Sequence, residues 1–233
     1  MSDAALALIG MGKMGRALQQ LAPERGCRVV ATLDAHHLIT RESLAGAQVA
    51  IEFTAPDAAS GNVRACVAAG VPVVVGTTGW YAELAAVSAE VSRAGGAMLT
   101  APNFSVGVAI FDRVVAEAAR LFAVVDGFDA HLVETHHAAK KDAPSGTAVS
   151  LAASAERASG RAMPITSVRV GSVPGTHEAL FDGAFEQVRL VHEARDRRVF
   201  AEGALAAARW LVGRRGVFTM QDVLSTPPGG GQR

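Results

Sequence analysis

Short apolar runs alternate with helix-like segments over the first hundred residues, and this alternation constrains the fold more than any other feature of the chain. The apolar runs have the length and composition of buried strands. Strand–helix alternation at this spacing builds right-handed βαβ units, and such units form a parallel sheet with helices on both faces. We therefore predict an α/β fold. The expected strands are residues 4–9, 28–33, 49–53, 71–75 and 97–100, and the expected helices are 16–25, 54–69 and 81–94.

A glycine-rich turn joins the first expected strand to the first helix. Its sequence, G-M-G-K-M-G, matches the pattern G-x-G-x-x-G. The first two glycines permit a tight turn and close approach of the backbone to a pyrophosphate, and the third permits close helix packing. The pattern alone is weak, but the strand before it and the helix after it favour a Rossmann-type dinucleotide site. The residues expected to contact the cofactor in this turn are Gly10, Met11, Gly12, Lys13, Met14 and Gly15.

The ends of the later strands extend this predicted site. Asp34 follows the second strand, about 20 residues beyond the glycine turn, where a carboxylate can accept hydrogen bonds from the ribose hydroxyls of NAD. The alternative is a merely polar strand end. Ligands of parallel sheets bind beyond the carboxyl ends of the strands, so two further loops are expected to contact the cofactor. Their residues are Gly76, Thr77, Thr78, Ala101, Pro102, Asn103 and Phe104.

The charges around Asp34 also suggest a cofactor preference. Asp34 would repel the 2′-phosphate of NADPH, whereas Lys13, His36, His37 and Arg41 are near enough in sequence to offset part of that repulsion. A like-charge contact at a surface costs about 1 kcal/mol or a little more. We expect NADH to be preferred by roughly tenfold in kcat/KM, with NADPH still used.

Composition and charge argue against several classes of protein. Lys and Arg together number 22, as do Asp and Glu, so there is no basic footprint for nucleic acid. The first residues lack a signal-peptide pattern, and no stretch reaches the roughly 20 apolar residues that span a bilayer. Cys27 and Cys66 have no metal-ligand spacing and resemble small core residues of a reducing compartment. We expect a soluble cytoplasmic protein with no metal site and no nucleic-acid or membrane partner.

The alternation stops after residue 104. A helix is expected at 105–122, a second at 145–158, and strands at 128–133, 165–171, 175–181 and 187–192. Two helices with several strands and no alternation predict an inserted α+β domain whose open sheet could pair across subunits. A helix at 199–212 and a strand at 217–220 would return the chain to the first sheet, and the Pro/Gly-rich end from 226 is expected to be disordered. The predicted domains are 1–104 with 198–233 for the dinucleotide, and 105–197 for substrate binding and oligomerisation.

The stretch 134–147, E-T-H-H-A-A-K-K-D-A-P-S-G-T, has the densest set of reactive side chains. It holds two adjacent histidines and two of the chain's three lysines. A helix beginning at Ser145, Gly146 and Thr147 would point unpaired backbone N–H groups at whatever occupies the loop. These groups could hold an anionic small molecule and move a proton to it. The alternative is a solvated connection with a helix cap.

The full string resembles the H-H-x-x-K-x-D-A-P-S-G-T signature of the 4-hydroxy-tetrahydrodipicolinate reductase family, also called dihydrodipicolinate reductases. Other family motifs follow in the family's order through nearly the whole chain. They are Glu52-Phe53-Thr54, Gly76-Thr77-Thr78-Gly79, residues 101–108, Arg169-Val170-Gly171, Gly175-Thr176-His177, and His192-Glu193-Ala194 with Arg197.

The resemblance implies a reaction and assigns roles within it. The family reduces a small cyclic unsaturated dicarboxylate on the diaminopimelate route to lysine with NADH or NADPH, commonly as a homotetramer. By position, His136 resembles the catalytic acid/base and Lys140 the proton donor. His137 resembles a substrate contact, and Gly146 and Thr147, beside Ser145, resemble the pair that binds a substrate carboxylate. His177, His192 and Arg197 match the family pattern but are equally consistent with buried hydrogen-bonding residues.

Two departures and two alternatives remain. The glycine turn is one residue shorter than is common in the family, and the segment between Asp34 and Gln48 is brief. Both departures concern the adenosine half of the cofactor and put its preference in question. One alternative is another small two-domain oxidoreductase of the amino-acid dehydrogenase type, which has no reason to carry this signature. The other is a non-catalytic dinucleotide-sensing protein, which would tolerate loss of His136 and Lys140.

Overall fold

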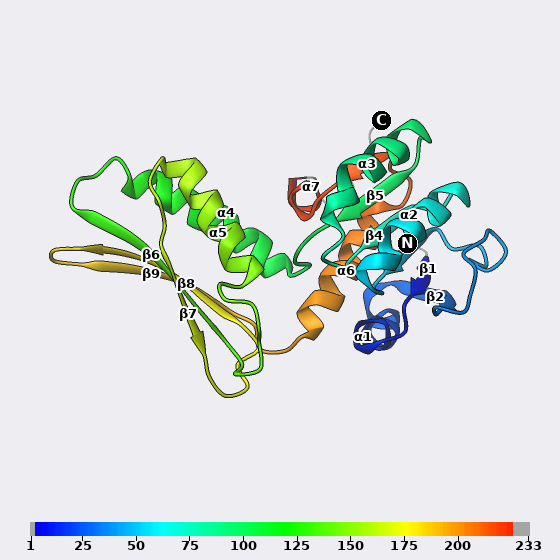
Figure 1. Ribbon diagram of the computed structural model, residues 1–233, viewed down its shortest axis with the longest axis horizontal. Helices are drawn as coiled ribbons and strands as arrows, with labels where there is room; N and C mark the ends of the chain where they lie inside the picture. Colours follow the sequence, from blue (N-terminus) through cyan, green and yellow to red (C-terminus); the bar gives the residue numbers. More distant parts are fainter. Residues whose placement is uncertain (1–2, 226–233) are drawn as a thin grey trace. The chain divides into compact units, whose positions relative to one another are not determined.

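The computed structural model describes residues 3–225. Contacts between residues divide the chain into two compact units. Unit 1 comprises Met1–Ser105 and Arg198–Arg233, and unit 2 comprises Val106–Arg197. Figure 1 shows the two units along the chain. The predicted disorder of residues 226–233 lies outside the described residues.

Unit 1 contains a six-stranded, wholly parallel sheet with the order β10-β5-β4-β3-β1-β2. The chain order reverses between β1 and β3, so a topological switch point, where ligands of such sheets bind, lies beside the glycine turn. β10 pairs with β5, as expected for the returning strand. The strands are β1 Ala4–Ile9, β2 Cys27–Leu33, β3 Val49–Glu52, β4 Val73–Val75, β5 Ala97–Thr100 and β10 Gly216–Phe218.

Helices cover both faces of this sheet (Figure 1). Apolar side chains of α2 and α3 pack with the strands in one core cluster, while α1 and α6 pack on the opposite face. The helices are α1 Lys13–Leu21, α2 Pro56–Ala68, α3 Leu84–Arg93, α6 Arg198–Leu211 and α7 Met220–Ser225, with short 3-10 turns at Pro23–Arg25 and Tyr81–Glu83.

Three local predictions for unit 1 need correction. The first helix was expected to reach residue 25, but it ends at Leu21 because Pro23 lacks the N–H that would continue it. The expected helix 81–94 is divided into a 3-10 turn and α3. The sequence interpretation also missed α7, a helix of six residues.

Unit 2 contains a four-stranded mixed sheet with the order β7-β6-β8-β9, in which only the β6–β7 pair is parallel. Helices α4 and α5 pack together over one face around an apolar cluster that includes Leu132, Leu151 and Phe181. This arrangement confirms the predicted α/β fold with an inserted α+β unit. The elements are α4 Val106–Phe122, β6 Phe128–His136, α5 Gly146–Ser159, β7 Ile165–Arg169, β8 Thr176–Gly183 and β9 Gln187–Glu193.

One correction in unit 2 bears directly on function. The strand predicted to end at residue 133 continues to His136, because β6 pairs with β7 and β8 along this extra length. His136 is therefore the last residue of a strand and not part of a free loop.

Candidate active site

A polar cluster lies at one end of the sheet face that packs against α4 and α5. Side chains alternate between the two faces of a strand, so Glu134 and His136 follow Leu132 on that face of β6. The neighbouring strands add Arg169 from β7, His177 from β8 and His192 from β9 in matching register. The same face is thus apolar at one end and polar at the other.

Glu134 is the fully buried centre of this cluster. Arg169 donates two hydrogen bonds to its carboxylate, at 3.0 Å to Oε2 and 2.6 Å to Oε1, and the backbone N–H of Ser145 donates a third at 3.2 Å to Oε1. Burial alone would raise the pKa of Glu134, but these donors, with Arg169 foremost, outweigh it and lower the pKa to about 2. Glu134 is therefore an ionised carboxylate at neutral pH.

His136 is buried at the end of β6 and hydrogen-bonds through Nδ1 to Oε2 of Glu134. Burial lowers the pKa of His136 more than the bond to Glu134 raises it. Its ring meets the ring of His177 edge-on at 5.3 Å between centroids. Burial, followed by the nearby His136, lowers the pKa of His177 to about 4. The cluster therefore holds neutral imidazoles beside a fixed ion pair.

Lys140 lies in the loop between β6 and α5, where its ammonium group donates to both carboxylate oxygens of Asp142 at 2.8 and 2.9 Å. The hydrogen bond from Lys140 is the main reason why the pKa of Asp142 is lowered, and the backbone N–H of Gly146 also bonds to this carboxylate. Lys140 and the first N–H of α5 were both predicted to face an anion. In the structure both bind the carboxylate of Asp142.

The other predicted residues of this loop surround the same place. Ser145 is the N-cap of α5 and accepts a hydrogen bond from the N–H of Ala148 at 3.2 Å. Its hydroxyl also lies 3.3 Å from Nε2 of His177. His137 is half-buried directly after β6, and Thr147 is half-buried in the first turn of α5.

Four residues of this region were not assigned to the site from the sequence, namely Glu134, Asp142, Arg169 and Gly175. Glu134 could have been found, because a strand period of two places it on the same face as His136. Asp142 could have been suspected from its place just before the N-terminus of a helix. Arg169 and Gly175 depend on the pairing of distant strands, and no local signal in the sequence gives that register.

The predicted glycine turn of unit 1 has the geometry that a dinucleotide requires. A methyl group on Gly10, whose φ is +92°, would lie 2.0 Å from the carbonyl oxygen of Phe53, and one on Gly15 would lie 2.1 Å from that of Gly10. Gly12 is the N-cap of α1 and has open space around it, with no side chain capping the helix and no acid in its first turn. This open N-terminus fits a pyrophosphate, and Met11, Lys13 and Met14 lie in the same turn.

Hydrogen bonds and ring contacts tie the next loops to this turn. The backbone N–H of Thr54 donates to Oγ1 of Thr77 at 2.8 Å, and Oγ1 of Thr54 hydrogen-bonds to Glu52. The rings of Phe53 and Phe104 meet edge-on at 6.0 Å. The structure thus brings the strand ends together, and the remaining predicted residues lie in the same loops, namely Gly76, Thr78, Ala101, Pro102 and Asn103.

Asp34 follows β2 as predicted, but it has local partners. Its Oδ1 accepts a hydrogen bond from the backbone N–H of His36 at 2.9 Å and lies 2.8 Å from Nδ1 of His37. These two contacts, the backbone bond first, lower the pKa of Asp34. Arg41 lies beside Gly70, just before β4, and therefore at the opposite edge of the sheet from the strand ends. Of the basic residues expected to offset Asp34, the two histidines contact it and Arg41 lies at the other edge.

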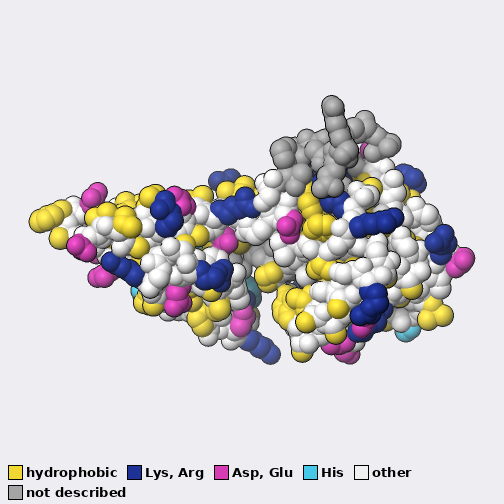
Figure 2. Space-filling model, turned by 90° about the horizontal axis from the view of Figure 1, so that it is seen from above, with side chains coloured by type: hydrophobic (Ala, Val, Ile, Leu, Met, Phe, Trp, Pro, Cys, Tyr) yellow, Lys and Arg dark blue, Asp and Glu magenta, His cyan; other side chains and the backbone are white. Residues whose placement is uncertain are grey.

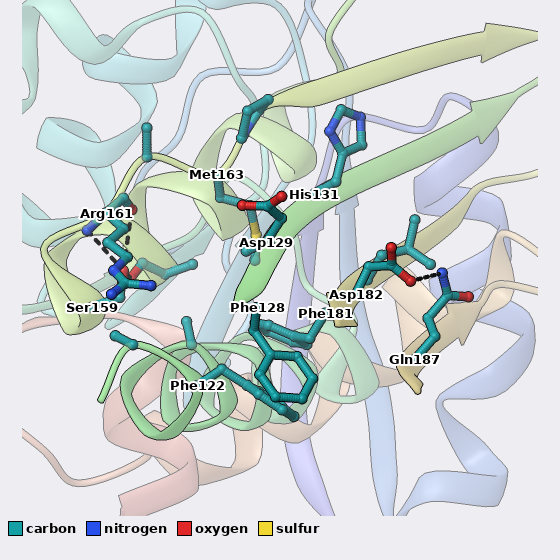
Figure 3. Close-up of a pocket in the computed structure, with 17 residues that line it drawn as sticks. Phe122, Phe128, Asp129, His131, Ser159, Arg161, Met163, Phe181, Asp182 and Gln187 are labelled. Atoms are coloured by element: carbon teal, nitrogen blue, oxygen red, sulfur yellow. Dashed lines mark hydrogen bonds between the residues drawn. The ribbon is translucent and has the colours of Figure 1, made fainter. Parts of the chain in front are cut away.

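A separate cavity of about 500 Å³ lies within unit 2. Figure 3 shows Phe122, Phe128 and Phe181 on its wall and the hydrogen bond of 2.8 Å that Gln187 donates to Asp182. None of its lining residues belongs to the stretch 134–147. The cavity is therefore distinct from the polar cluster.

Residues 3–225 contain neither a cluster of metal ligands nor a membrane-spanning helix. No group of three or more His, Cys, Asp and Glu side chains is arranged to hold a metal ion. No helix among these residues is both long enough and apolar enough to cross a bilayer. On the face shown in Figure 2, basic and acidic side chains are interspersed.

Solved structures of known proteins share this architecture. A probable dehydrogenase from Thermotoga maritima shares the fold at a TM-score of 0.62 and 11% identity, covering 94% of this chain and 92% of its own. A dipicolinate-bound dihydrodipicolinate reductase from Paenisporosarcina sp. TG-14 is more similar, with a TM-score of 0.80, 22% identity, and coverage of 93% of this chain and 97% of its own. Sequence relatives named as reductases, together with this shared fold, make this chain an oxidoreductase enzyme that uses a nicotinamide cofactor.

Sequence comparisons then define the family. Models described as "Dihydrodipicolinate reductase, N-terminus" and "Dihydrodipicolinate reductase, C-terminus" match residues 4–104 and 107–224. The 4-hydroxy-tetrahydrodipicolinate reductase of Thiobacillus denitrificans is 38% identical, over 91% of this chain and 95% of the relative. That of Christiangramia forsetii is 34% identical, over 94% and 97%. The chain belongs to the dihydrodipicolinate reductase family.

Proposed function

We propose that this protein catalyses the NAD(P)H-dependent reduction of 4-hydroxy-tetrahydrodipicolinate to tetrahydrodipicolinate on the diaminopimelate route to lysine. The sequence relatives are named for this reductase activity. One observation carries the assignment beyond the family name. Unit 2 gathers a buried histidine, a lysine and the N-terminus of a helix in one place. The fold alone would not suffice, because a dehydrogenase with 11% identity shares it.

The substrate is a dicarboxylate, and the loop 134–147 has the groups to bind one. Lys140 supplies a positive charge, and the N–H groups of Gly146 and Thr147 at the start of α5 supply donors beside the positive end of the helix dipole. Asp142 engages two of these groups within the chain, and this contact with a carboxylate supports the proposal. Ser145 caps the helix and holds this arrangement, and His137 contacts the substrate from the end of β6.

The 4-hydroxyl group leaves as water, and reduction of the conjugated double bond that this forms requires a hydride at one atom and a proton at its neighbour. The reduced nicotinamide supplies the hydride when it is bound to unit 1. Lys140 donates the proton, and His136 acts as the acid/base that balances the charge developing in the transition state. Both side chains are partly shielded from bulk water, because His136 is buried and Lys140 is half-buried.

NADH is the preferred cofactor, and NADPH is also used. The carboxylate of Asp34 is exposed beyond β2, where it can accept hydrogen bonds from ribose hydroxyls and would repel a 2′-phosphate. Arg41 lies beside Gly70, away from the strand ends, so its charge does not offset that of Asp34, and this supports the preference for NADH.

The protein is a cytoplasmic homotetramer in this proposal, and its sheet of unit 2 supplies the contact between copies. Val168 and Val191 are exposed apolar side chains on the face of that sheet opposite the helices. A second sheet could cover them. Cys27 and Cys66 are buried free thiols, consistent with a reducing compartment.

The test is a coupled assay in which pyruvate and aspartate semialdehyde are condensed and the absorbance of NADH is followed. We expect substrate-dependent oxidation of NADH, and slower oxidation of NADPH. Folded protein that binds NADH but shows no substrate-dependent rate with either cofactor would refute the proposal. A rate with an amino acid and NAD⁺ in place of this substrate would instead favour an amino-acid dehydrogenase.

A further inference from the structure

Glu134 lies where it can control the chemistry of His136 without touching substrate. The two residues are two positions apart on β6, so their side chains share a face of the sheet. Nδ1 of His136 hydrogen-bonds to Oε2 of Glu134. Glu134 is fully buried, so no water competes for this bond.

The partners of Glu134 determine which atom holds the proton. Arg169 and the backbone N–H of Ser145 both donate to the carboxylate, which is ionised. An ionised carboxylate can only accept hydrogen bonds. The bond to His136 therefore requires a hydrogen on Nδ1, and a neutral His136 then has its lone pair on Nε2.

The surroundings of Nε2 are consistent with an atom that exchanges a proton. A methyl group built on Gly175 would lie 3.0 Å from Nε2, and Gly175 itself has no side chain that could fill this space. The backbone of Gly175 is also held in place, since its carbonyl accepts the N–H of Ala194 at 2.9 Å. Glycine at this position therefore leaves space beside Nε2 that any other side chain would fill.

We propose that Glu134 is a positioning residue for the reductase reaction: it fixes His136 with a hydrogen on Nδ1 and leaves Nε2 as the atom that exchanges a proton with the reacting molecule. Arg169 keeps Glu134 charged and oriented through its two hydrogen bonds. This role rests on the proposed function through the part given to His136. It parallels carboxylate–histidine pairs elsewhere, in which the carboxylate sets the tautomer.

Glu134→Gln tests this role because an amide can donate to Nδ1 and so favour the opposite tautomer. We expect kcat to fall by about 10²-fold or more, as expected for loss of a correctly placed proton acceptor. Affinity for NADH should not change. Glu134→Asp keeps the charge on a shorter side chain and should restore part of kcat.

A matched control lies on the same sheet. Glu178 of β8, like Glu134, is paired with an arginine, at 3.2 Å to Arg189, but it is only partly buried and its side chain points to the other face. Glu178→Gln should leave kcat within about twofold, in line with the small contribution of partly exposed ion pairs. An equal loss of kcat in both variants would mean that any lost ion pair disturbs the sheet, and would overturn the proposal.

Two further measurements separate positioning from a structural role. In protein labelled with ¹⁵N-histidine, the signals missing from His136→Gln identify His136, and they should show the hydrogen on Nδ1 in wild type and on Nε2 in Glu134→Gln. Glu134 also raises the pKa of His136, so its removal should move the acidic limb of the kcat/KM profile to lower pH. The other charged or titratable groups near His136, namely Arg169, Lys140, Asp142 and His177, are retained in this variant.

These outcomes distinguish failure of the inference from failure of the proposed function. The tautomer in wild type is measured without substrate, so it decides the inference even if the assay gives no rate. A wild-type His136 with its hydrogen on Nε2 would overturn the proposal. So would a Glu134→Gln variant that keeps kcat within threefold, or one that loses kcat with the tautomer and pH profile unchanged. If Glu134→Gln does not fold, the wild-type tautomer and the pH profile of Glu134→Asp decide.

Discussion

Each unit of the protein fully buries one glutamate near the end of a central strand, Glu52 in β3 and Glu134 in β6, and their partners differ. Glu134 has Arg169 and other donors on both oxygens. Glu52 has only neutral partners, the hydroxyl of Thr54 and, at 3.3 Å, the amide of Asn62. Its Oε2 has no hydrogen-bond partner within residues 3–225.

This difference reflects two ways of building a binding site. Unit 2 presents side-chain charges, and ion pairs hold them in place. Unit 1 presents backbone amides, and it places them by close packing at glycines, such as Gly10 against Phe53 and Gly203 of α6 against the carbonyl of Phe104. Added bulk should therefore damage unit 1 most, and a change of charge or protonation should damage unit 2 most.

The largest effect is expected from Gly10→Ala. The new methyl group would lie 2.0 Å from a backbone oxygen, at a φ of +92° that non-glycine residues rarely adopt. We expect a loss of about 3 kcal/mol or more in the free energy of unfolding and loss of NADH binding. Gly12→Ala is the matched control for stability, because nothing lies within 4 Å of its methyl group. Equal stability of the two variants in urea would contradict the close-packing explanation for unit 1.

Acid should weaken unit 2 in two steps. The folded pKa of His177 is lowered by burial from 6.5 to about 4. Below pH 6.5 the unfolded chain therefore binds a proton that the folded chain does not, and stability falls toward pH 4 by up to about 3 kcal/mol. Glu134 adds a second loss in the same direction: its lowered pKa stabilises the fold above pH 4.5, and this stabilisation is lost between pH 4.5 and about 2. Urea unfolding of wild type and His177→Gln between pH 7 and 4 checks the first step, which should be flatter in the variant.

The next effect, about 10²-fold in kcat, is expected from removing either proton-transfer group. His136→Gln and Lys140→Ala should each lower kcat by this factor with NADH affinity unchanged, because unit 1 is untouched. His137→Ala should instead raise KM, since a positioning contact stabilises bound substrate and transition state alike. Steady-state kinetics and NADH titrations measure both. Near-full kcat in His136→Gln would mean that His136 is not the acid/base of the reaction.

The sequence predicts the structure of unit 1 better than that of unit 2. Alternation and the glycine turn are local signals, so the parallel sheet, the turn geometry and even the returning strand β10 follow from short segments. In unit 2, Arg169 reaches Glu134 only because β7 pairs in parallel with β6, and that register depends on tertiary packing. His136 was expected in a loop for the same reason, since β-pairing beyond residue 133 extends the strand. Pro23 was a local signal that the first helix stops, and it was missed.

The smallest effect concerns the choice between NADH and NADPH. It depends on Asp34, a charged side chain in unit 1, whose binding site otherwise consists mainly of backbone groups. We expect wild type to favour NADH by roughly tenfold in kcat/KM, equivalent to about 1.4 kcal/mol. Asp34→Ala should narrow this ratio by weakening the binding of NADH and relieving the repulsion of NADPH.

The control is Glu42→Ala, which removes an exposed acid in the same segment and should leave the ratio unchanged. Both cofactors are measured on all three proteins at low salt, where screening is weakest. The imidazole of His37 already contacts the Asp34 carboxylate, so a preference for NADPH in wild type would mean that this contact, with Lys13 of the glycine turn, outweighs the repulsion between Asp34 and the 2′-phosphate.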